Sequence, residues 1–119
     1  MSYDEAIRGY RESDCAGLLR LRNAAAALAA DGRYLTAEAQ RSSLERPGYR
    51  PEENLFVIEM NGGVVGYADV IVELKLGRAI VAGYVEPVQR RHGLGGRLYQ
   101  RAEARARQAG VKIVQVNVN

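Results

Sequence analysis

The sequence has little cysteine, histidine or proline: one Cys, one His and three Pro among 119 residues. Its single thiol, Cys15, cannot form an intramolecular disulfide, so we expect the chain in the reducing cytoplasm rather than among disulfide-stabilised secreted domains. A metal site needs several converging His, Cys or carboxylate ligands, and no such cluster is visible, so no metal is expected. Residues 1–5 show neither the basic nor the apolar region of a secretory signal.

Long apolar runs are also absent. The longest, Ala24–Ala30, is mostly alanine and far shorter than the roughly 20 residues that a membrane span needs, so we expect no membrane contact. Apolar residues make up 47% and charged residues 26%, which is ordinary for a soluble globular protein and excludes disorder, collagen and a coiled coil. The length fits one domain over residues 1–119.

The net charge is only +3, but positive charge is concentrated in one stretch. Residues 86–112 contain seven basic and two acidic residues, whereas the remainder carries ten basic and twelve acidic residues. A local basic cluster favours a small polyanion or a nucleic acid as ligand, and it is equally compatible with a solvated helix face. The modest total charge argues against a nucleic-acid partner.

The first part of the chain is predicted to form a strand and a helix. The strand is expected over residues 4–10. The helix starts near Cys15, is capped by Ser13 or Asp14, and ends at Asp31-Gly32, because apolar residues recur there at helical spacing. These apolar residues are Leu18, Leu21, Ala25 and Leu28.

A second helix is predicted to follow directly. Thr36 is expected to cap it, Glu38 in its first turn suits the positive end of the helix dipole, and it runs through Glu45. After it, Pro47 and Pro51 are expected to prevent regular structure.

The second half of the chain is predicted to form strands and one further helix. Asn61-Gly62-Gly63 and the segment 75–77 mark tight turns, and Gly83 is expected to sit at a bulge. One strand is expected to begin at Leu55, and three more are expected over residues 64–72, 78–85 and 111–118. The helix is expected over residues 94–108. This order, β-α-α-β-β-β-α-β, indicates an α/β protein with a mixed sheet.

Residues 89–96, Gln-Arg-Arg-His-Gly-Leu-Gly-Gly, are predicted to form a basic, glycine-rich loop between a strand and a helix. The helix start offers unpaired N–H groups, and glycine lets a phosphate approach the backbone, so we expect an anion site here. A P-loop is excluded because Gly96 is followed by Arg97 rather than by Lys and Ser or Thr. The dinucleotide fingerprint fails because Leu98 stands at its sixth position.

A third pattern fits the loop. The sequence Val85-x-Pro87-x-x-Arg90-x-x-Gly93-x-Gly95-Gly96-x-Leu98 resembles the acyl-CoA-binding motif of the GNAT-type N-acetyltransferases. Further residues are placed as in that family, namely Arg8, Asp14, Leu18 and Gly66. The resemblance covers nearly the whole chain. It implies an acyl-CoA N-acyltransferase-like fold that binds acetyl-CoA and transfers its acetyl group to an amine.

The resemblance also implies a role for each motif residue. Arg90 would order the loop or touch phosphate, and the backbone of Tyr84 and Val85 would pair with the pantetheine amides. An N–H near Val85 would polarise the thioester carbonyl, and the amine would attack it directly, without an acyl-enzyme. Backbone N–H groups of the loop would hold the CoA pyrophosphate; these belong to Arg91, His92, Gly93, Leu94, Gly95 and Gly96.

The same resemblance implies an acid that accepts the amine proton. Glu73 and Glu86 are the candidates nearest to the motif strand. Tyr34, between the first two helices, would line the acceptor pocket. The amine itself is not identified, and no residue is assigned to protonate the leaving thiolate.

In the family, a further helix and two strands follow the last strand expected here, whereas this sequence ends at Asn119. We therefore expect a C-terminally truncated fold with an exposed apolar edge at residues 111–118. Three hypotheses follow: an acetyltransferase or its N-terminal portion, a non-catalytic CoA-binding regulatory module, or a fragment completed by another domain or by a second copy of the chain.

Overall fold

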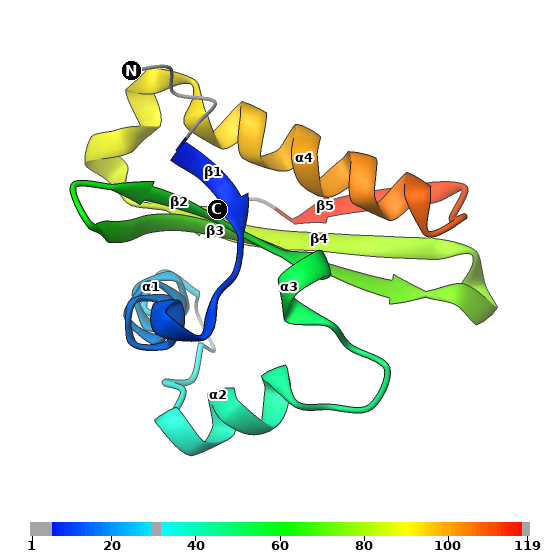
Figure 1. Cartoon of the computed structure of the whole chain (residues 1–119), viewed down its shortest axis with the longest axis horizontal. Helices are drawn as coiled ribbons and strands as arrows, with labels where there is room; N and C mark the ends of the chain where they lie inside the picture. The colour runs from blue at the N-terminus through cyan, green and yellow to red at the C-terminus, as the bar shows by residue number, and fades with distance from the viewer. Residues whose placement is uncertain (1–5, 30–31, 118–119) are drawn as a thin grey trace.

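The computed structural model describes residues 6–29 and 32–117 and shows a five-stranded sheet with helices on both faces (Figure 1). The strands are β1 (Ile7–Gly9), β2 (Leu55–Met60), β3 (Gly63–Glu73), β4 (Arg78–Val85) and β5 (Ile113–Asn117). They lie side by side in chain order, and all neighbours are antiparallel except β4 and β5, which are parallel. The predicted mixed α/β sheet is confirmed.

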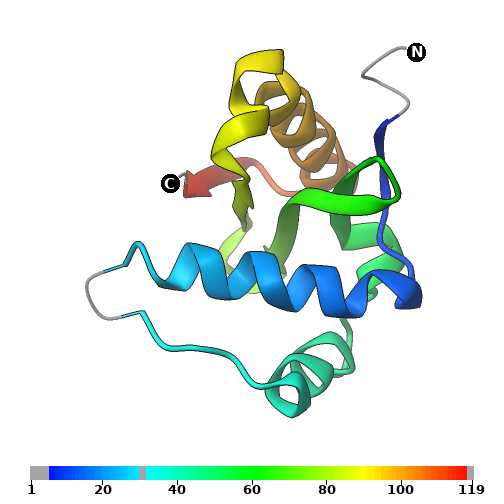
Figure 2. The ribbon, with the colours of Figure 1, turned by 90° about the vertical axis from the view of Figure 1, so that its left-hand side faces the viewer.

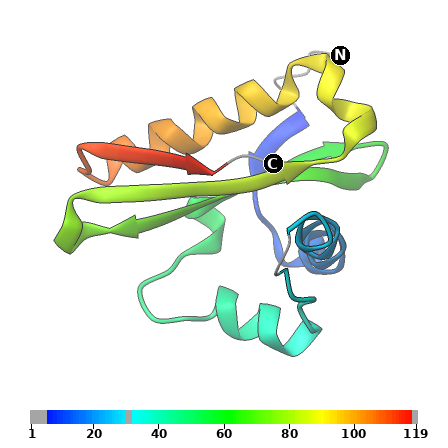
Figure 3. The ribbon, with the colours of Figure 1, turned by 180° about the vertical axis from the view of Figure 1, so that it is seen from behind.

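Helices divide between the two faces of the sheet. Helix α4 (Leu94–Gln108) covers one face, while α1 (Cys15–Ala26) and α2 (Ala37–Leu44) lie on the other, as the perpendicular view also shows (Figure 2). From behind, β5 is seen as the outer strand next to β4 (Figure 3). The short segments are α3 (Pro51–Asn54) and the 3₁₀ turns η2 (Glu12–Asp14), η3 (Leu74–Leu76) and η4 (Pro87–His92).

Each face of the sheet has its own apolar core. Successive side chains of a strand point to opposite faces, so Tyr67 packs with α1 while Ala68 packs with α4. Gly17 brings α1 close to β3, because a β-carbon there would lie 2.3 Å from Cγ2 of Val64. The α4 core includes Ile58, Val70, Val81, Val85, Leu94, Leu98 and Ala102, and the α1 core includes Leu18, Leu21, Leu55, Val57 and Tyr84.

Two local predictions are confirmed. Asn61 and Gly62 both adopt positive φ angles, 54° and 80°, in the hairpin turn between β2 and β3. The hydroxyl of Thr36 accepts a hydrogen bond from the N–H of Ala39 at 3.1 Å and caps α2. Both features depend on interactions between residues close together in the chain, so they can be predicted from the sequence.

The predicted extent of the first helix is wrong. Helix α1 ends at Ala26, and the next residues form short-range turns in which Leu28 donates to the carbonyl of Ala25. As a result Leu28 is 63% exposed instead of joining the core. Asp31 lies outside the described residues.

Helix α1 starts at Cys15 with Asp14 at its N-cap position, as predicted. The Asp14 side chain makes no capping hydrogen bond, because its carboxylate is occupied by Arg8 and by the N–H of Arg11. The two outer strands, β1 and β5, are shorter than predicted. Residues 4, 5 and 118 of those predictions lie outside the described residues.

Two further corrections concern proline and glycine. Pro51 does not prevent regular structure but begins α3, where the first helical position needs no N–H donor. Gly83 is not at a bulge: the pairing of β3 with β4 is unbroken there, and the register shift lies instead between Ile58 and Glu59. Glycine is required at 83 because a β-carbon would lie 2.2 Å from the carbonyl oxygen of Tyr67.

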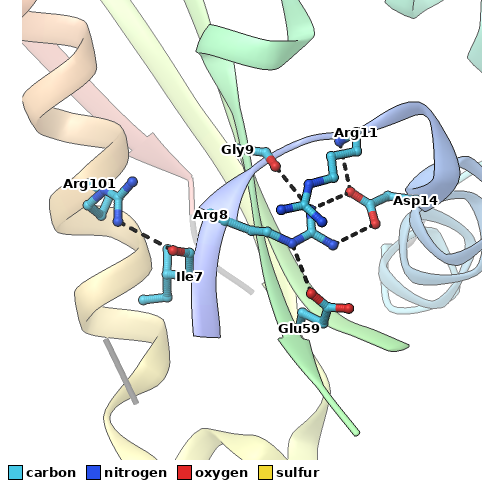
Figure 4. A network of polar contacts seen from close by, with 7 residues as sticks. All are labelled: Ile7, Arg8, Gly9, Arg11, Asp14, Glu59 and Arg101. Carbon is cyan, nitrogen blue, oxygen red and sulfur yellow. Dashed lines mark hydrogen bonds and ion pairs between the residues drawn. The ribbon is translucent and has the colours of Figure 1, made fainter. Parts of the chain in front are cut away.

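A cluster of ion pairs around Arg8 joins β1, the start of α1 and β2 (Figure 4). The guanidinium of Arg8 donates to both oxygens of Asp14, at 2.8 and 2.9 Å, and to Glu59 at 3.0 Å. The N–H of Arg11 also donates to Asp14, at 2.8 Å. Burial raises the pKa of Asp14, but the hydrogen bonds from Arg8 and Arg11 outweigh it, so that the pKa lies below its ordinary value of 3.8.

We predict that Asp14→Asn lowers the free energy of unfolding at neutral pH by about 2–4 kcal/mol, because it leaves the buried end of Arg8 without its charged partner. A carboxylate with a depressed pKa stabilises the fold above its ordinary value of 3.8, and this contribution is lost as the pH falls through its folded-state pKa. The free energies of unfolding of the wild type and the variant, measured in urea, should therefore become more similar as the pH is lowered. Glu12→Gln, an exposed neighbour, is the control and should change little at any pH.

We predict that Gly83→Ala destabilises the fold by about 1–3 kcal/mol, because the added methyl group would meet rigid backbone. Gly63→Ala on β3 is the matched control, since a β-carbon there meets no atom within 4 Å. Thermal unfolding of the two variants decides the matter. Equal stability of both would contradict the close approach of Gly83 to Tyr67.

Candidate functional site: the loop between β4 and α4

The loop that joins β4 to α4 is shaped by its ends. Pro87 begins the 3₁₀ turn η4, Gly93 turns the chain with a φ of 71°, and the buried Leu94 anchors the first turn of α4 in the core. The first N–H groups of α4 have no carbonyl one turn earlier in the helix. They therefore face the loop, at the positive end of the helix dipole.

A cavity of about 180 Å³ lies between this loop and the end of β4. Its lining residues are Tyr84, Val85, Arg90, Gly93, Gly95, Gly96 and Tyr99. Six of the nine predicted cofactor-binding residues thus come together in one place. Of the others, Leu94 points into the core, and the side chains of Arg91 and His92 lie outside what the structure describes.

The cavity opens on an edge of β4 that has no strand beside it in the described chain. The described pairing of β4 with β5 extends to Ala82 and Asn117, the last described residue of β5, while β4 runs on to Val85. The N–H of Glu86 donates to Val65 on β3 at 2.9 Å. Because backbone direction alternates along a strand, Tyr84 also faces β3, whereas Gly83 and Val85 face the side of β5. The pairing of Ala82 with Asn117 uses the N–H of Gly83, so Val85 is the residue that faces past the described end of β5.

This alternation separates the two strand residues that were predicted to pair with pantetheine. Val85 does present its backbone to the open edge, while Tyr84 contributes its ring to the cavity and its backbone to β3. The sequence does not show this difference in direction between the two residues. The missing information was the position of Glu86 opposite Val65, which fixes the direction of every residue in the strand.

Arg90 ties the loop to the strand. Its Nε donates to the carbonyl of Val85 at 2.9 Å, and its guanidinium carbon lies 5.3 Å from the centre of the Tyr84 ring. Of the two predicted roles of Arg90, ordering the loop is the one that these contacts support.

The structure separates the two predicted acids. Glu86 lies at the start of the loop and forms an ion pair with Arg20 of α1, which also donates to the carbonyl of Val64 at 2.8 Å. Glu73 lies at the far end of β3, where it pairs with Arg78 at 2.9 Å. It is seven residues along the strand from Gly66, the partner of Val85, which corresponds to about 23 Å.

Tyr34, the predicted acceptor residue, is 74% exposed in the segment between α1 and α2.

The sequence analysis missed Asp69 on β3, although it is the one acid within the predicted strand 64–72. It is buried and accepts a hydrogen bond from the Tyr49 hydroxyl at 2.5 Å. Burial raises its pKa, against the opposing effects of Tyr49 and nearby arginines.

Within the described chain, no helix combines the length and apolar character of a membrane span. A larger cavity, of about 620 Å³, lies between the start of α1 and helices α2 and α3. It is lined by residues such as Tyr10, Cys15 and Leu44, and has no glycine loop at its edge.

Comparison with known proteins agrees with this geometry. The pattern of the acetyltransferase (GNAT) family matches residues 17–119, and no curated protein sequence matches the chain. Ribosomal-protein-alanine N-acetyltransferase from Brucella melitensis is 24% identical, with a TM-score of 0.77 over 92% of this chain and 72% of that one. An N-acetyltransferase from Staphylococcus aureus Mu50 is 21% identical, with a TM-score of 0.78 over 92% and 70%.

A third similar structure, yncA from Salmonella typhimurium, was solved with its cofactor acetyl-CoA. It is 26% identical, with a TM-score of 0.76 over 92% of this chain and 67% of that one. The family match includes most of α1, strands β2 to β5 and the whole β4–α4 loop. Since it spans well over half of the residues, the chain belongs to the acetyltransferase (GNAT) family.

Proposed function

We propose that the chain binds acetyl-CoA at the β4–α4 loop and transfers its acetyl group to a primary amine by direct attack. The observation that carries this proposal is the single cavity that joins the glycine loop at the start of α4 to the open edge of β4. The 26% identical Salmonella protein, solved with acetyl-CoA, supports the same cosubstrate.

The loop fits a pyrophosphate. A β-carbon at Gly93 or Gly96 would meet no atom within 4 Å, so there is space for phosphate oxygens directly against the backbone. The N–H groups of the first turn of α4 supply donors, and the dipole of this 15-residue helix favours a negative charge there. The loop thus offers a phosphate group open space, N–H donors and a positive electrostatic potential at the same place.

The open edge of β4 fits the pantetheine arm. Arg90 occupies the carbonyl of Val85, which leaves the N–H of Val85 for a ligand. An extended arm with amide groups can pair with this edge as a further strand would. The N–H of Val85 is then the donor that can polarise the thioester carbonyl.

The amine proton needs an acceptor near the loop. Glu86 is the one of the two predicted acids that the fold brings there, and we assign it this role. Its ion pair with Arg20 holds the carboxylate at the end of β4. The amine would have to compete with Arg20 for the carboxylate of Glu86. Arg20 is therefore part of the proposed amine site.

We predict that acetyl-CoA binds the purified chain with measurable heat in titration calorimetry and raises its unfolding temperature. Release of free CoA thiol on addition of a panel of primary amines would identify an enzyme, and Glu86→Gln should then slow turnover. Binding without thiol release would favour the non-catalytic alternative. The absence of both heat and thermal shift at millimolar ligand would overturn the proposal.

We predict that Gly96→Glu weakens acetyl-CoA binding at least about tenfold while the fold remains intact. The side chain has room, but it places a negative charge where the pyrophosphate would sit. Gln108→Glu adds the same charge at the other end of α4 and is the matched control. Equal affinities of the two variants would show that the loop is not the anion site.

A further inference from the structure

The side chain of Arg20 links helix α1 to the β4–α4 loop. Arg20 lies in the middle of α1, and Nη1 of its guanidinium forms an ion pair with Glu86, which directly follows the end of β4. The other terminal nitrogen, Nη2, donates to the carbonyl of Val64 on β3 at 2.8 Å. One nitrogen of the guanidinium is thus fixed to the sheet, while the other meets a carboxylate.

Both members of this ion pair are accessible to a ligand. The side chain of Arg20 is 57% exposed and that of Glu86 is 25% exposed. An ion pair of this exposure contributes little to stability, so separating its two charges costs little. Arg20 keeps its position when Glu86 is taken by a ligand, because the hydrogen bond to Val64 remains.

An amine that binds at Glu86 changes the charge balance of the pair. Primary amines are largely protonated at neutral pH, so the acceptor arrives as an ammonium group. When this group takes the place of Arg20 at the carboxylate, the guanidinium loses its negative partner. An acceptor with no other charge leaves Arg20 in that state, whereas an acceptor with a carboxylate supplies a new partner.

The contact between the two side chains limits the spacing of the ligand charges. Arg20 and Glu86 touch each other, so the two charges that replace them must also lie close together. In an α-amino acid the ammonium and the carboxylate are attached to the same carbon atom. In a peptide the free carboxylate lies at the other end of the chain. A guanidinium is also the side-chain group whose planar N–H donors best match a carboxylate.

On the basis of the proposed function, we infer that the acceptor is a free α-amino acid, whose ammonium binds Glu86 and whose carboxylate binds Arg20. The nitrogen bonds to the acetyl carbon, the carbon–sulfur bond breaks, and its electron pair stays on sulfur. The nitrogen loses two protons in all: one ends on sulfur, and one is released to solvent through Glu86. The products are an N-acetylamino acid and the free CoA thiol.

The test compares free amino acids with their α-amides, which lack only the carboxylate charge. Glycine, leucine, glutamate and arginine are each assayed in both forms by release of the CoA thiol. In the wild type, kcat/KM for at least one free acid should exceed that for its amide about tenfold, as expected for a charge-assisted hydrogen bond. Comparing the same ratio between variants cancels the intrinsic reactivity of each amine.

Arg20→Gln should remove this preference by raising KM for the free acid about tenfold, with little change in KM for the amide or for acetyl-CoA. Arg20→Lys keeps the positive charge and should restore part of the preference. Arg107→Gln is the matched control, because it also removes an exposed ion pair with a glutamate, Glu103, at the far end of α4. It should leave the preference unchanged.

Binding of the same amino acids to the CoA-saturated chain, measured by titration calorimetry, gives a readout without turnover. It should weaken about tenfold in Arg20→Gln. If CoA binds but no free acid is preferred to its amide in turnover or in binding, the inference is overturned and the proposed function stands. A preference that survives Arg20→Gln, or that is lost equally in Arg107→Gln, also overturns it. Failure of the wild type to bind CoA would overturn the proposed function itself, and the inference with it.

Discussion

Within residues 6–29 and 32–117, strand β4 has a partner along its whole length on one side and along only part of its length on the other. It pairs with β3 from Arg78 to Val85, but with β5 only as far as Ala82. A buried strand normally satisfies its backbone groups on both edges. Among the described residues, no strand lies beside Val85 on the side of β5, and Arg90 donates to its carbonyl instead. The contact of Arg90 with Val85 and the cavity beside it both lie at this end of the strand.

The N-terminal part of the chain contacts the same end of β4 from the α1 face of the sheet. Gly17 allows α1 to touch β3, and Arg20 reaches from α1 to Glu86 at the start of the loop. The cluster of Arg8 and Asp14 fixes the start of α1 to the edge of the sheet. The contacts that hold helix α1 against the sheet thus lie in its first half. The helix ends earlier, at Ala26, than the spacing of its apolar residues predicts.

The sequence predicts most of the fold and the place of the site, because both depend on local signals. Glycine after a strand, proline at the strand end and an apolar helix stripe identify the β4–α4 loop without any tertiary information. Leu28 is different, because helical spacing continues past the point where the helix has a surface to cover. Gly83 is misassigned to a bulge, since only the structure shows the carbonyl of Tyr67 beside it.

The functional roles of single side chains are harder to predict for a related reason. Glu73 and Glu86 look equivalent in the sequence, yet the strand pairing puts one beside the loop and the other at the far end of the sheet. Asp69 shows no special pattern in the sequence. Its raised pKa comes from burial, and its hydrogen bond comes from Tyr49, 20 residues away in the chain. Such relations are set by register, which a single sequence does not display.

Strand β5 is the outermost strand of the sheet and leaves Ile113 and Val116 exposed, at 61% and 41%. An outer strand of this kind is a template on which another strand can be added. The two neighbours of β4 therefore differ: β3 has a hydrogen-bonded strand on each side, whereas β5, in the described residues, has one only on the side of β4. Among the described residues, the backbone groups on the side of β5 away from β4 are therefore those with which a further strand, from this chain or from another, could pair.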